Sequence, residues 1–80
     1  MPRLRVLSGA DVIGILREFG FERFSTRGSH IKVRRIVNGQ SESLTIPDHK
    51  EIDRGTLQAI LRQAARFVPD SELRPHFYTE

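Results

Sequence analysis

The dipeptide Asn38-Gly39 constrains the fold of this 80-residue chain more than any other feature of the sequence. Asn-Gly favours a two-residue type I′ turn, because both of its central positions need a positive φ angle. The segments on either side alternate apolar and polar residues, which is typical of strands with one buried face. If Val37 faces Gln40 across the turn, the register of both strands can be counted outward. The dipeptide therefore predicts an antiparallel hairpin.

The counted register brings together residues of matching character on each face. The matched pairs are Ile31 with Ile46, Val33 with Leu44 and Arg35 with Glu42 on one face, and Lys32 with Thr45 and Arg34 with Ser43 on the other. Apolar pairs and opposite charges facing each other stabilise a sheet. Because a slip of one residue would destroy every match, the register is well specified.

The run Arg27-Gly28-Ser29-His30 leads into the first strand of this hairpin. Glycine and serine form turns, so the strand is entered through a tight turn, and His30 falls opposite Pro47 in the counted register. Side chains alternate across a strand, so His30, Lys32 and Arg34 share one face, and the apolar residues between them share the other. The polar face could hold an anion such as a phosphodiester beside a proton-transfer group.

Helices are predicted on both sides of the strands. Ser8 as N-cap and Asp11 at the third helical position form a capping box for a helix over residues 9–19, and Gly20 suits the left-handed position after it. Residues 21–26 are a weaker strand candidate, and the third strand ends at Pro47. Asp53 is the expected N-cap of a second helix. Residues 69–73 provide one short helical turn in the tail, ending before a proline at position 75.

The predicted order is helix, three antiparallel strands, helix. Each helix has one apolar stripe and the sheet has one apolar face, so both helices must pack on that face. We therefore expect an α+β fold over a single domain, residues 1–80. Its α-β-β-β-α layout, a three-stranded antiparallel sheet with two helices packed on one face, resembles a double-stranded-RNA-binding domain (dsRBD).

Composition narrows the possible partners. Thirteen Lys and Arg oppose ten Asp and Glu, for a net charge of +3, and eleven of the thirteen are arginine. Arginine presents a planar fork suited to phosphate or carboxylate, which favours nucleic acid or an acidic protein. No cysteine is present, and no metal-ligand spacing is seen, so no cofactor is expected. The chain has no apolar run long enough for a bilayer and no signal-peptide pattern at its start, so we expect no membrane partner and a cytoplasmic location.

An ordered set of motifs resembles the HicA toxin family, also called YcfA-like. The set comprises Gly28-Ser29-His30, Ile46-Pro47-Asp48-His49, Gly55-Thr56-Leu57, Ile60-Leu61 and Gln63-Ala64. The resemblance extends from about Ser8 to Ala64. It implies a dsRBD-like fold, an endoribonuclease that cleaves mRNA without ribosomes, and a HicB-like antitoxin that blocks it. It also implies that the histidine of the Gly-x-His turn, His30, is catalytic.

The chemistry of His30 supports the same role independently. When RNA is cut by its own 2′-hydroxyl group, one group must accept that proton and another must protonate the leaving oxygen. Histidine can do either near neutral pH. Lys32 and Arg34, on the same face, can neutralise charge that develops on the phosphorus centre. The alternative is that His30 is a turn residue hydrogen-bonded to the backbone.

The remaining candidates are predicted RNA contacts, which are Arg27, Ser29, Lys32, Arg34, His49, Arg54, Gly55 and Thr56. His49 could instead be the second proton-transfer group, or a loop histidine that closes toward a helix start. Arg54, Gly55 and Thr56 open the second helix, whose free amides favour an anion. In the alternative interpretation, Gly55 only avoids a clash with the sheet. Arg3 and Arg5 are either a flexible phosphate-contacting arm or simply solvated.

Two other functions use the same residues. A non-catalytic RNA-binding module would use the basic face for salt-sensitive binding without cleavage. A protein-interaction module would use it to receive an acidic partner.

Overall fold

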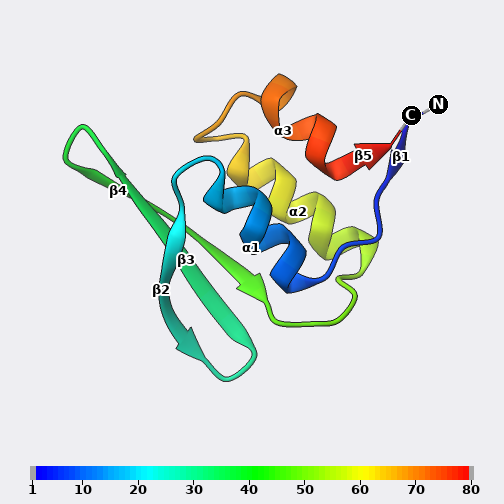
Figure 1. The fold of residues 1–80 in the computed structure, drawn as a ribbon, viewed down its shortest axis with the longest axis horizontal. Coiled ribbons are helices and arrows are strands. Elements are labelled where there is room, and N and C mark those ends of the chain that lie inside the picture. The colour runs from blue at the N-terminus through cyan, green and yellow to red at the C-terminus, as the bar shows by residue number, and fades with distance from the viewer. Residues whose placement is uncertain (1, 80) are drawn as a thin grey trace.

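The computed structural model describes residues 2–79, and the ribbon is drawn in Figure 1. The elements are β1 (Arg3–Leu4), α1 (Gly9–Arg17), β2 (Glu22–Arg27), β3 (His30–Val37), β4 (Gln40–Pro47), α2 (Arg54–Ala64), α3 (Asp70–Phe77) and β5 (Tyr78–Thr79). Strands β2, β3 and β4 form one antiparallel sheet in that order. The predicted α-β-β-β-α arrangement is confirmed, with a third helix and a small β1–β5 pair added to it.

The β3–β4 hairpin has the register that the Asn-Gly turn predicts. Asn38 has a φ of 52° and Gly39 a φ of 78°, the positive angles of a type I′ turn. All the predicted pairs are present, from Val37 opposite Gln40 at the turn to His30 opposite Pro47 at the far end. The turn chemistry and the apolar pattern therefore fix the same pairing.

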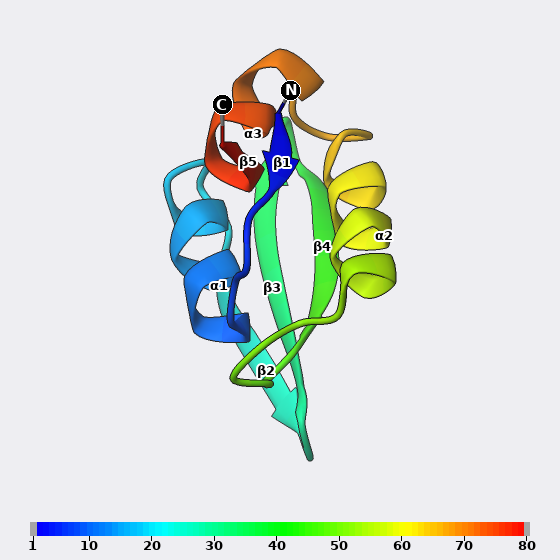
Figure 2. The same ribbon diagram turned by 90° about the vertical axis from the view of Figure 1, so that its right-hand side faces the viewer.

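Both main helices cover one face of the sheet. Figure 2 shows α1 and α2 standing side by side in front of the strands. The face beneath them, which we call the covered face, buries alternate residues of β3 and β4 that belong to a single hydrophobic core: Ile31, Val33, Leu44 and Ile46. Burying each such side chain stabilises the folded protein by about 1.5–3 kcal/mol. The core therefore fixes which way β3 presents its other side chains.

Each of these helices begins where the sequence predicts. Ser8 Oγ accepts a hydrogen bond from the Asp11 amide at 3.0 Å, and the Asp11 carboxylate accepts one from the Ser8 amide at 3.0 Å, so the capping box is complete. The hydrogen bond from the Ser8 amide to the carboxylate is the main cause that lowers the pKa of Asp11 below its ordinary value of 3.8, followed by the Ser8 side chain and, to a smaller degree, the charge of Arg5. Asp53 caps α2 in a similar way.

Gly9 allows the start of α1 to approach the end of β4 very closely. A Cβ atom at this position would collide with the carbonyl oxygen of Pro47 and would lie 3.1 Å from the Cα atom of Asp48. The Gly9 amide donates to the carbonyl oxygen of His49 at 2.9 Å. The β4–α2 loop is therefore fastened to the start of α1, a contact that helix capping alone does not predict.

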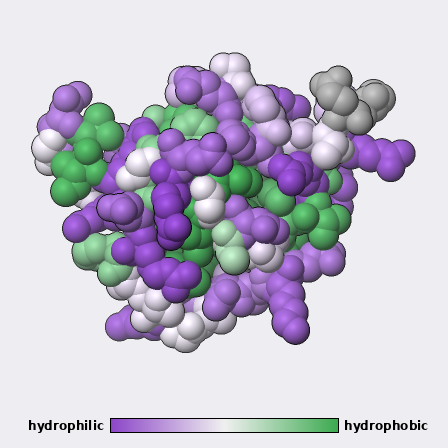
Figure 3. All heavy atoms as spheres, viewed as in Figure 1, coloured by the Kyte–Doolittle hydropathy of each residue, from purple (hydrophilic) through white to green (hydrophobic). Residues whose placement is uncertain are grey.

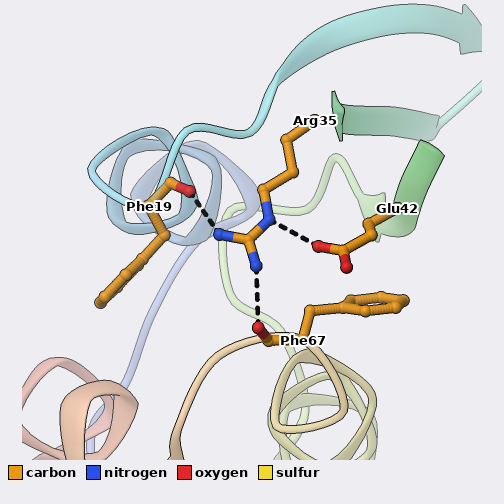
Figure 4. A network of polar contacts seen from close by, with 4 residues as sticks. All are labelled: Phe19, Arg35, Glu42 and Phe67. Atoms are coloured by element: carbon orange, nitrogen blue, oxygen red, sulfur yellow. Dashed lines mark hydrogen bonds and ion pairs between the residues drawn. The ribbon is translucent and has the colours of Figure 1, made fainter. Parts of the chain in front are cut away.

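Arg35 joins the sheet to both helices (Figure 4). Its guanidinium donates to Glu42 Oε1 at 2.6 Å, as the register predicts, and also to the carbonyl oxygens of Phe19 and Phe67, each at 2.8 Å. Those carbonyls lie just beyond the last turns of α1 and α2, where helix dipoles place partial negative charge. Only 18% of the Arg35 side chain is exposed. The cation therefore neutralises two helix ends and one carboxylate together.

The two ends of the described chain differ from the sequence-based expectation. Strand β1 pairs with β5, with Arg3 opposite Thr79, so the segment around Arg3 is not a flexible arm. Arg5 is held as well, because it donates to the carbonyl oxygen of His76 at 2.9 Å. The tail helix α3 continues through Pro75 and does not stop before it. Its buried Leu73 and Phe77 outweigh the local cost of a proline within a helix.

Candidate nucleic-acid interface

The sheet face away from the helices, which we call the open face, carries the predicted site. His30 and Lys32 lie on it and are exposed, whereas Ile31 and Val33, which alternate with them along β3, are buried. Arg34 continues the row and is half-buried. The prediction that a histidine and two cations share one face of β3 is therefore confirmed. His30 is not sealed beneath the helices, so it is accessible to a ligand.

A two-residue turn presents His30 at the start of β3. Gly28 has a φ of 58°, and Arg27 pairs directly with His30 across the turn. A positive φ at only the first central residue is the pattern of a type II′ hairpin turn. The carbonyl oxygen of Ser29 accepts a hydrogen bond from the Asp48 amide at 2.6 Å. The turn is thus anchored to the β4–α2 loop, which in turn is fastened to α1.

His30 lines a hollow of about 490 Å³. We call it the His30 hollow. It is lined by Ser25, Thr26, Arg27, His30, Lys32 and Thr45. The volume lies in the range of small-molecule sites, and the groups around it are one imidazole, two cations and three hydroxyls. Such groups suit a phosphate and the ribose hydroxyls beside it. Of the predicted site residues, Arg27, His30 and Lys32 meet here.

A bulge in β2 accommodates an extra residue next to this hollow. The β2–β3 pairing shifts between Arg23 and Ser25, so that Phe24 is an extra residue in the ladder. Beyond it, Ser25 pairs with Lys32 and Arg27 with His30, all on the open face. In a regular strand, residues an odd number of positions apart lie on opposite faces. The bulge therefore brings Arg27 to the same face as Phe24. The sequence pattern did not predict this bulge.

The cations of the open face have no acidic side chain at ion-pair distance among the described residues. The ion pairs found within residues 2–79 are Arg35 with Glu42 and Arg74 with Asp70. Arg34 instead places its Cζ atom 3.8 Å from the centre of the Phe24 ring, at cation–π distance. Arg27 and Lys32 thus carry positive charge without an ion pair, which favours an anionic ligand, whereas Arg34 has Glu22 opposite it across the β2–β3 ladder.

The chain is similar to a known protein family over most of its length. Residues 9–65 match the family described as HicA toxin of bacterial toxin-antitoxin systems. The match covers well over half of the chain and spans every element from α1 to α2. The chain belongs to the HicA toxin family. Comparisons with curated proteins and with solved structures gave no match. Within residues 2–79, no helix combines the length and the apolar character needed to cross a membrane.

In this HicA family member, His49 does not share the hollow of His30. It lines a separate one with Ser8, Ala10, Asp48 and Lys50, next to the start of α1. Its backbone carbonyl is the acceptor for Gly9, so the loop does close toward a helix start. The structure therefore brings one imidazole, not two, to the His30 hollow.

The predicted anion site at the start of α2 is already occupied by a side chain. Thr56 donates its amide to Asp53 Oδ2 at 3.1 Å and its hydroxyl to Asp53 Oδ1 at 2.8 Å. These bonds, more than the nearby charge of His49, lower the pKa of Asp53 below 3.8. An anion here would have to displace that carboxylate. Arg54 instead lines a hollow with Arg3 and Arg5, away from His30.

Gly55 does not serve to avoid a clash with the sheet, as the alternative interpretation supposed. A Cβ atom there would lie 3.6 Å from Asp53 Oδ2, an ordinary van der Waals contact.

Among the described residues, no three His, Cys, Asp or Glu side chains are grouped so that they could hold a metal ion. The His30 hollow presents one imidazole, two cations and three hydroxyls.

Proposed function

We propose that this HicA family toxin is an endoribonuclease that cuts mRNA, with His30 as its general acid or base. The observation that carries the proposal is the position of His30, exposed on the open face in one hollow with Arg27 and Lys32. A histidine that only stabilised its turn would need a backbone partner, and no hydrogen bond of its side chain is found among the described residues.

The chemistry can be written with RNA, these side chains and solvent water. The 2′-oxygen attacks the adjacent phosphorus, the bond from phosphorus to the 5′-oxygen breaks, and the proton of the 2′-hydroxyl goes to a base. The leaving 5′-oxygen takes a proton from an acid. The products are a 2′,3′-cyclic phosphate and a 5′-hydroxyl end. His30 can perform one of these transfers and solvent water the other, and Arg27 and Lys32 stabilise the additional negative charge of the phosphorane.

The partner we propose is a HicB-like antitoxin that binds over the open face. Membership of a toxin–antitoxin family supports an antitoxin partner. An inhibitor that covered the exposed His30 and its cations would exclude RNA directly. The location we propose is the cytoplasm, where mRNA is translated. Ser29, His49, Arg54, Gly55 and Thr56 remain predicted RNA contacts, and they lie outside the His30 hollow.

The decisive experiment incubates single-stranded RNA with the purified protein in the presence of EDTA. We expect cleavage with 5′-hydroxyl ends, and no cleavage of a DNA strand of the same sequence, which lacks the attacking 2′-hydroxyl group. His30→Ala should lose the activity, whereas the matched control His76→Ala should keep it, because the ring of His76 packs edge-on against Phe19. Cleavage by His30→Ala at the parent rate would exclude this mechanism.

One observation favours a second candidate, a non-catalytic RNA-binding module. General acid and base catalysis uses two proton-transfer groups, and the His30 hollow contains one imidazole. A module of this kind would bind RNA with a steep salt dependence and release no products. The same incubation separates the two candidates, because binding without any cleavage products supports the module alone.

A further inference from the structure

Phe24 is a large aromatic side chain that the fold leaves uncovered. Its exposed fraction is 51%, while the buried Phe21 and Phe77 are fully enclosed in the core. Burying an aromatic ring contributes more to folding than burying most other side chains. The bulge at this position keeps Phe24 on the open face without moving Ser25 and Arg27 away from the His30 hollow. A ring held in this way is available to a ligand.

Arg34 is paired with this ring. Its Cζ atom lies 3.8 Å from the ring centre, and both residues line a second hollow of about 270 Å³ together with Glu22 and Ile36. Aromatic rings and guanidinium planes are the two surfaces on which proteins stack unpaired RNA bases. The carboxylate of Glu22 adds an acceptor for an exocyclic amino group at the edge of such a base.

The pair lies on the same row as the proposed catalytic group. His30 and Arg34 are four residues apart on one face of β3, which corresponds to about 13 Å. A stacked nucleic-acid strand advances about 3.4 Å per phosphate, so this distance spans up to about four nucleotides, and fewer if the strand is extended. One strand of RNA can therefore contact the His30 hollow and the Phe24 ring together.

We propose that Phe24 and Arg34 form a stacking subsite for an unpaired base of the RNA whose phosphate is bound at His30. The inference rests on the proposed function, because it takes RNA as the ligand of the open face. The subsite adds a contact to a base, which the cations of the His30 hollow do not supply. It would make the protein prefer single-stranded RNA to a duplex, in which the bases are already stacked.

The surroundings of the pair favour RNA over a protein partner as the occupant. Apolar residues do continue toward the hairpin tip, where Ile36 is 63% and Val37 38% exposed, and Figure 3 shows apolar atoms at that projecting end. In the other direction, the row continues with Lys32 and then His30, flanked by hydroxyl groups. Cations and hydroxyls in line with an aromatic ring match a strand of alternating phosphates, riboses and bases.

The test compares two single-stranded 12-mers in which every 2′-oxygen is methylated, so that neither can be cut by its own hydroxyl. One carries bases and the other is abasic throughout, and both carry the same phosphates. Dissociation constants are measured for the parent, Phe24→Leu, Phe24→Tyr, Lys32→Gln and Val37→Ala. Because Phe24 is exposed, its variants should fold normally, which thermal unfolding verifies.

We expect Phe24→Leu to weaken binding of the base-containing strand about 5- to 100-fold and to leave the abasic strand within about twofold. Phe24→Tyr keeps an aromatic face and should bind like the parent, and Val37→Ala, which lies outside both hollows, should do so too. Lys32→Gln should weaken both strands equally, because it contacts phosphate. These values need no cleavage, so they remain interpretable even if the proposed nuclease activity is absent.

Two results would overturn the subsite. If Phe24→Leu binds both strands like the parent, the ring takes no base. If Phe24→Leu and Val37→Ala both lose affinity for a HicB-like antitoxin while RNA binding is unchanged, the ring belongs to a protein-docking surface.

Discussion

Arg34 and Arg35 are neighbours in β3 with the same side chain, but they lie on opposite faces of the sheet and have different roles. Arg35 is enclosed on the covered face and donates to one carboxylate and two helix-end carbonyls. Arg34 lies on the open face with His30 and Lys32, and the contact found for it is the exposed ring of Phe24. A cation whose hydrogen bonds are all made within the protein holds the fold together. A cation without such partners is available to a ligand. The difference between the two faces suggests which charges are functional.

The largest effect that would test this comparison is expected at His30. His30→Ala should lower the rate of RNA cleavage about 100- to 10,000-fold, because a positioned acid or base contributes that much. Its unfolding free energy should stay within about 0.5 kcal/mol of the parent, as for other exposed positions. Cleavage assays and urea denaturation measure the two quantities. A large loss of stability would show that the imidazole has a structural role.

Arg35→Met should give the opposite result. It removes the guanidinium but keeps most of the aliphatic length, and it leaves Glu42 and two helix-end carbonyls without a donor. We expect a loss of about 2–3 kcal/mol in unfolding free energy, with partial exposure reducing the penalty of a fully buried pair. Arg34→Met is the matched control and should cost about 0.5 kcal/mol. Equal losses from the two variants would contradict the distinction between the faces.

Gly9→Ala should destabilise the protein by about 1–3 kcal/mol, because its Cβ atom would collide with the backbone of the β4–α2 loop. That loop also holds the His30 turn through the bond from the Asp48 amide to Ser29. We therefore expect RNA cleavage to fall as well, under conditions in which the variant is still folded. Gly14→Ala is the control, since a Cβ atom there meets nothing within 4 Å. Similar unfolding curves for both variants would refute the close approach.

Single replacement of Arg27 or Lys32 by Gln should weaken RNA binding without affecting the fold. Each removal of one phosphate contact should reduce the slope of log affinity against log salt by about 0.7–1. Arg17→Gln, at the end of α1, is the control for a change in net charge alone. The slopes are measured by titrations at several salt concentrations. A slope that changed equally with Arg17→Gln would show that only the net charge matters.

The smallest effect is expected at Asp53, an exposed carboxylate that accepts hydrogen bonds from Thr56. Its folded-state pKa lies below 3.8, because Thr56 donates to the ionised carboxylate. The stabilisation is therefore complete above the unfolded-state pKa and is lost as the pH falls through the folded-state value. Asp53→Asn should flatten the dependence of stability on pH below about 4. An unchanged acid limb of the unfolding curve would contradict this assignment.

The sequence was sufficient for the hairpin because two independent signals agreed there. Asn38-Gly39 set the turn and the alternation of apolar residues set the register, so the pairing of Arg35 with Glu42 followed directly. The same counting placed His30, Lys32 and Arg34 on one face. Both helix starts were predicted as well, because capping depends on residues only three positions apart.

The features that sequence reasoning missed depend on distant contacts. The bulge at Phe24 lies in a strand whose residues are all exposed, so no apolar alternation marks the shift. The carbonyl partners of Arg35 are 16 and 32 residues away from it. Strand β1 pairs with residues at the other end of the chain, and α3 runs through Pro75 because its apolar residues are buried. Secondary-structure propensity depends on local sequence and gives no information about such distant contacts.

The extra residue in β2 makes the site unusually sensitive to chain length. If Phe24 were deleted, Arg23 would be followed directly by Ser25, and the ladder could run from Glu22 to Arg27 without interruption. Arg27 would still pair with His30, but the ring of Phe24, which we propose stacks on a base, would be gone. If instead one residue between Phe24 and Arg27 were deleted, the shorter strand could keep either the Arg27–His30 turn or the ring of Phe24 on the open face, but not both. Substitutions in β2 are therefore expected to be tolerated far better than deletions, and natural or engineered length variants of this strand would separate cleavage from base preference.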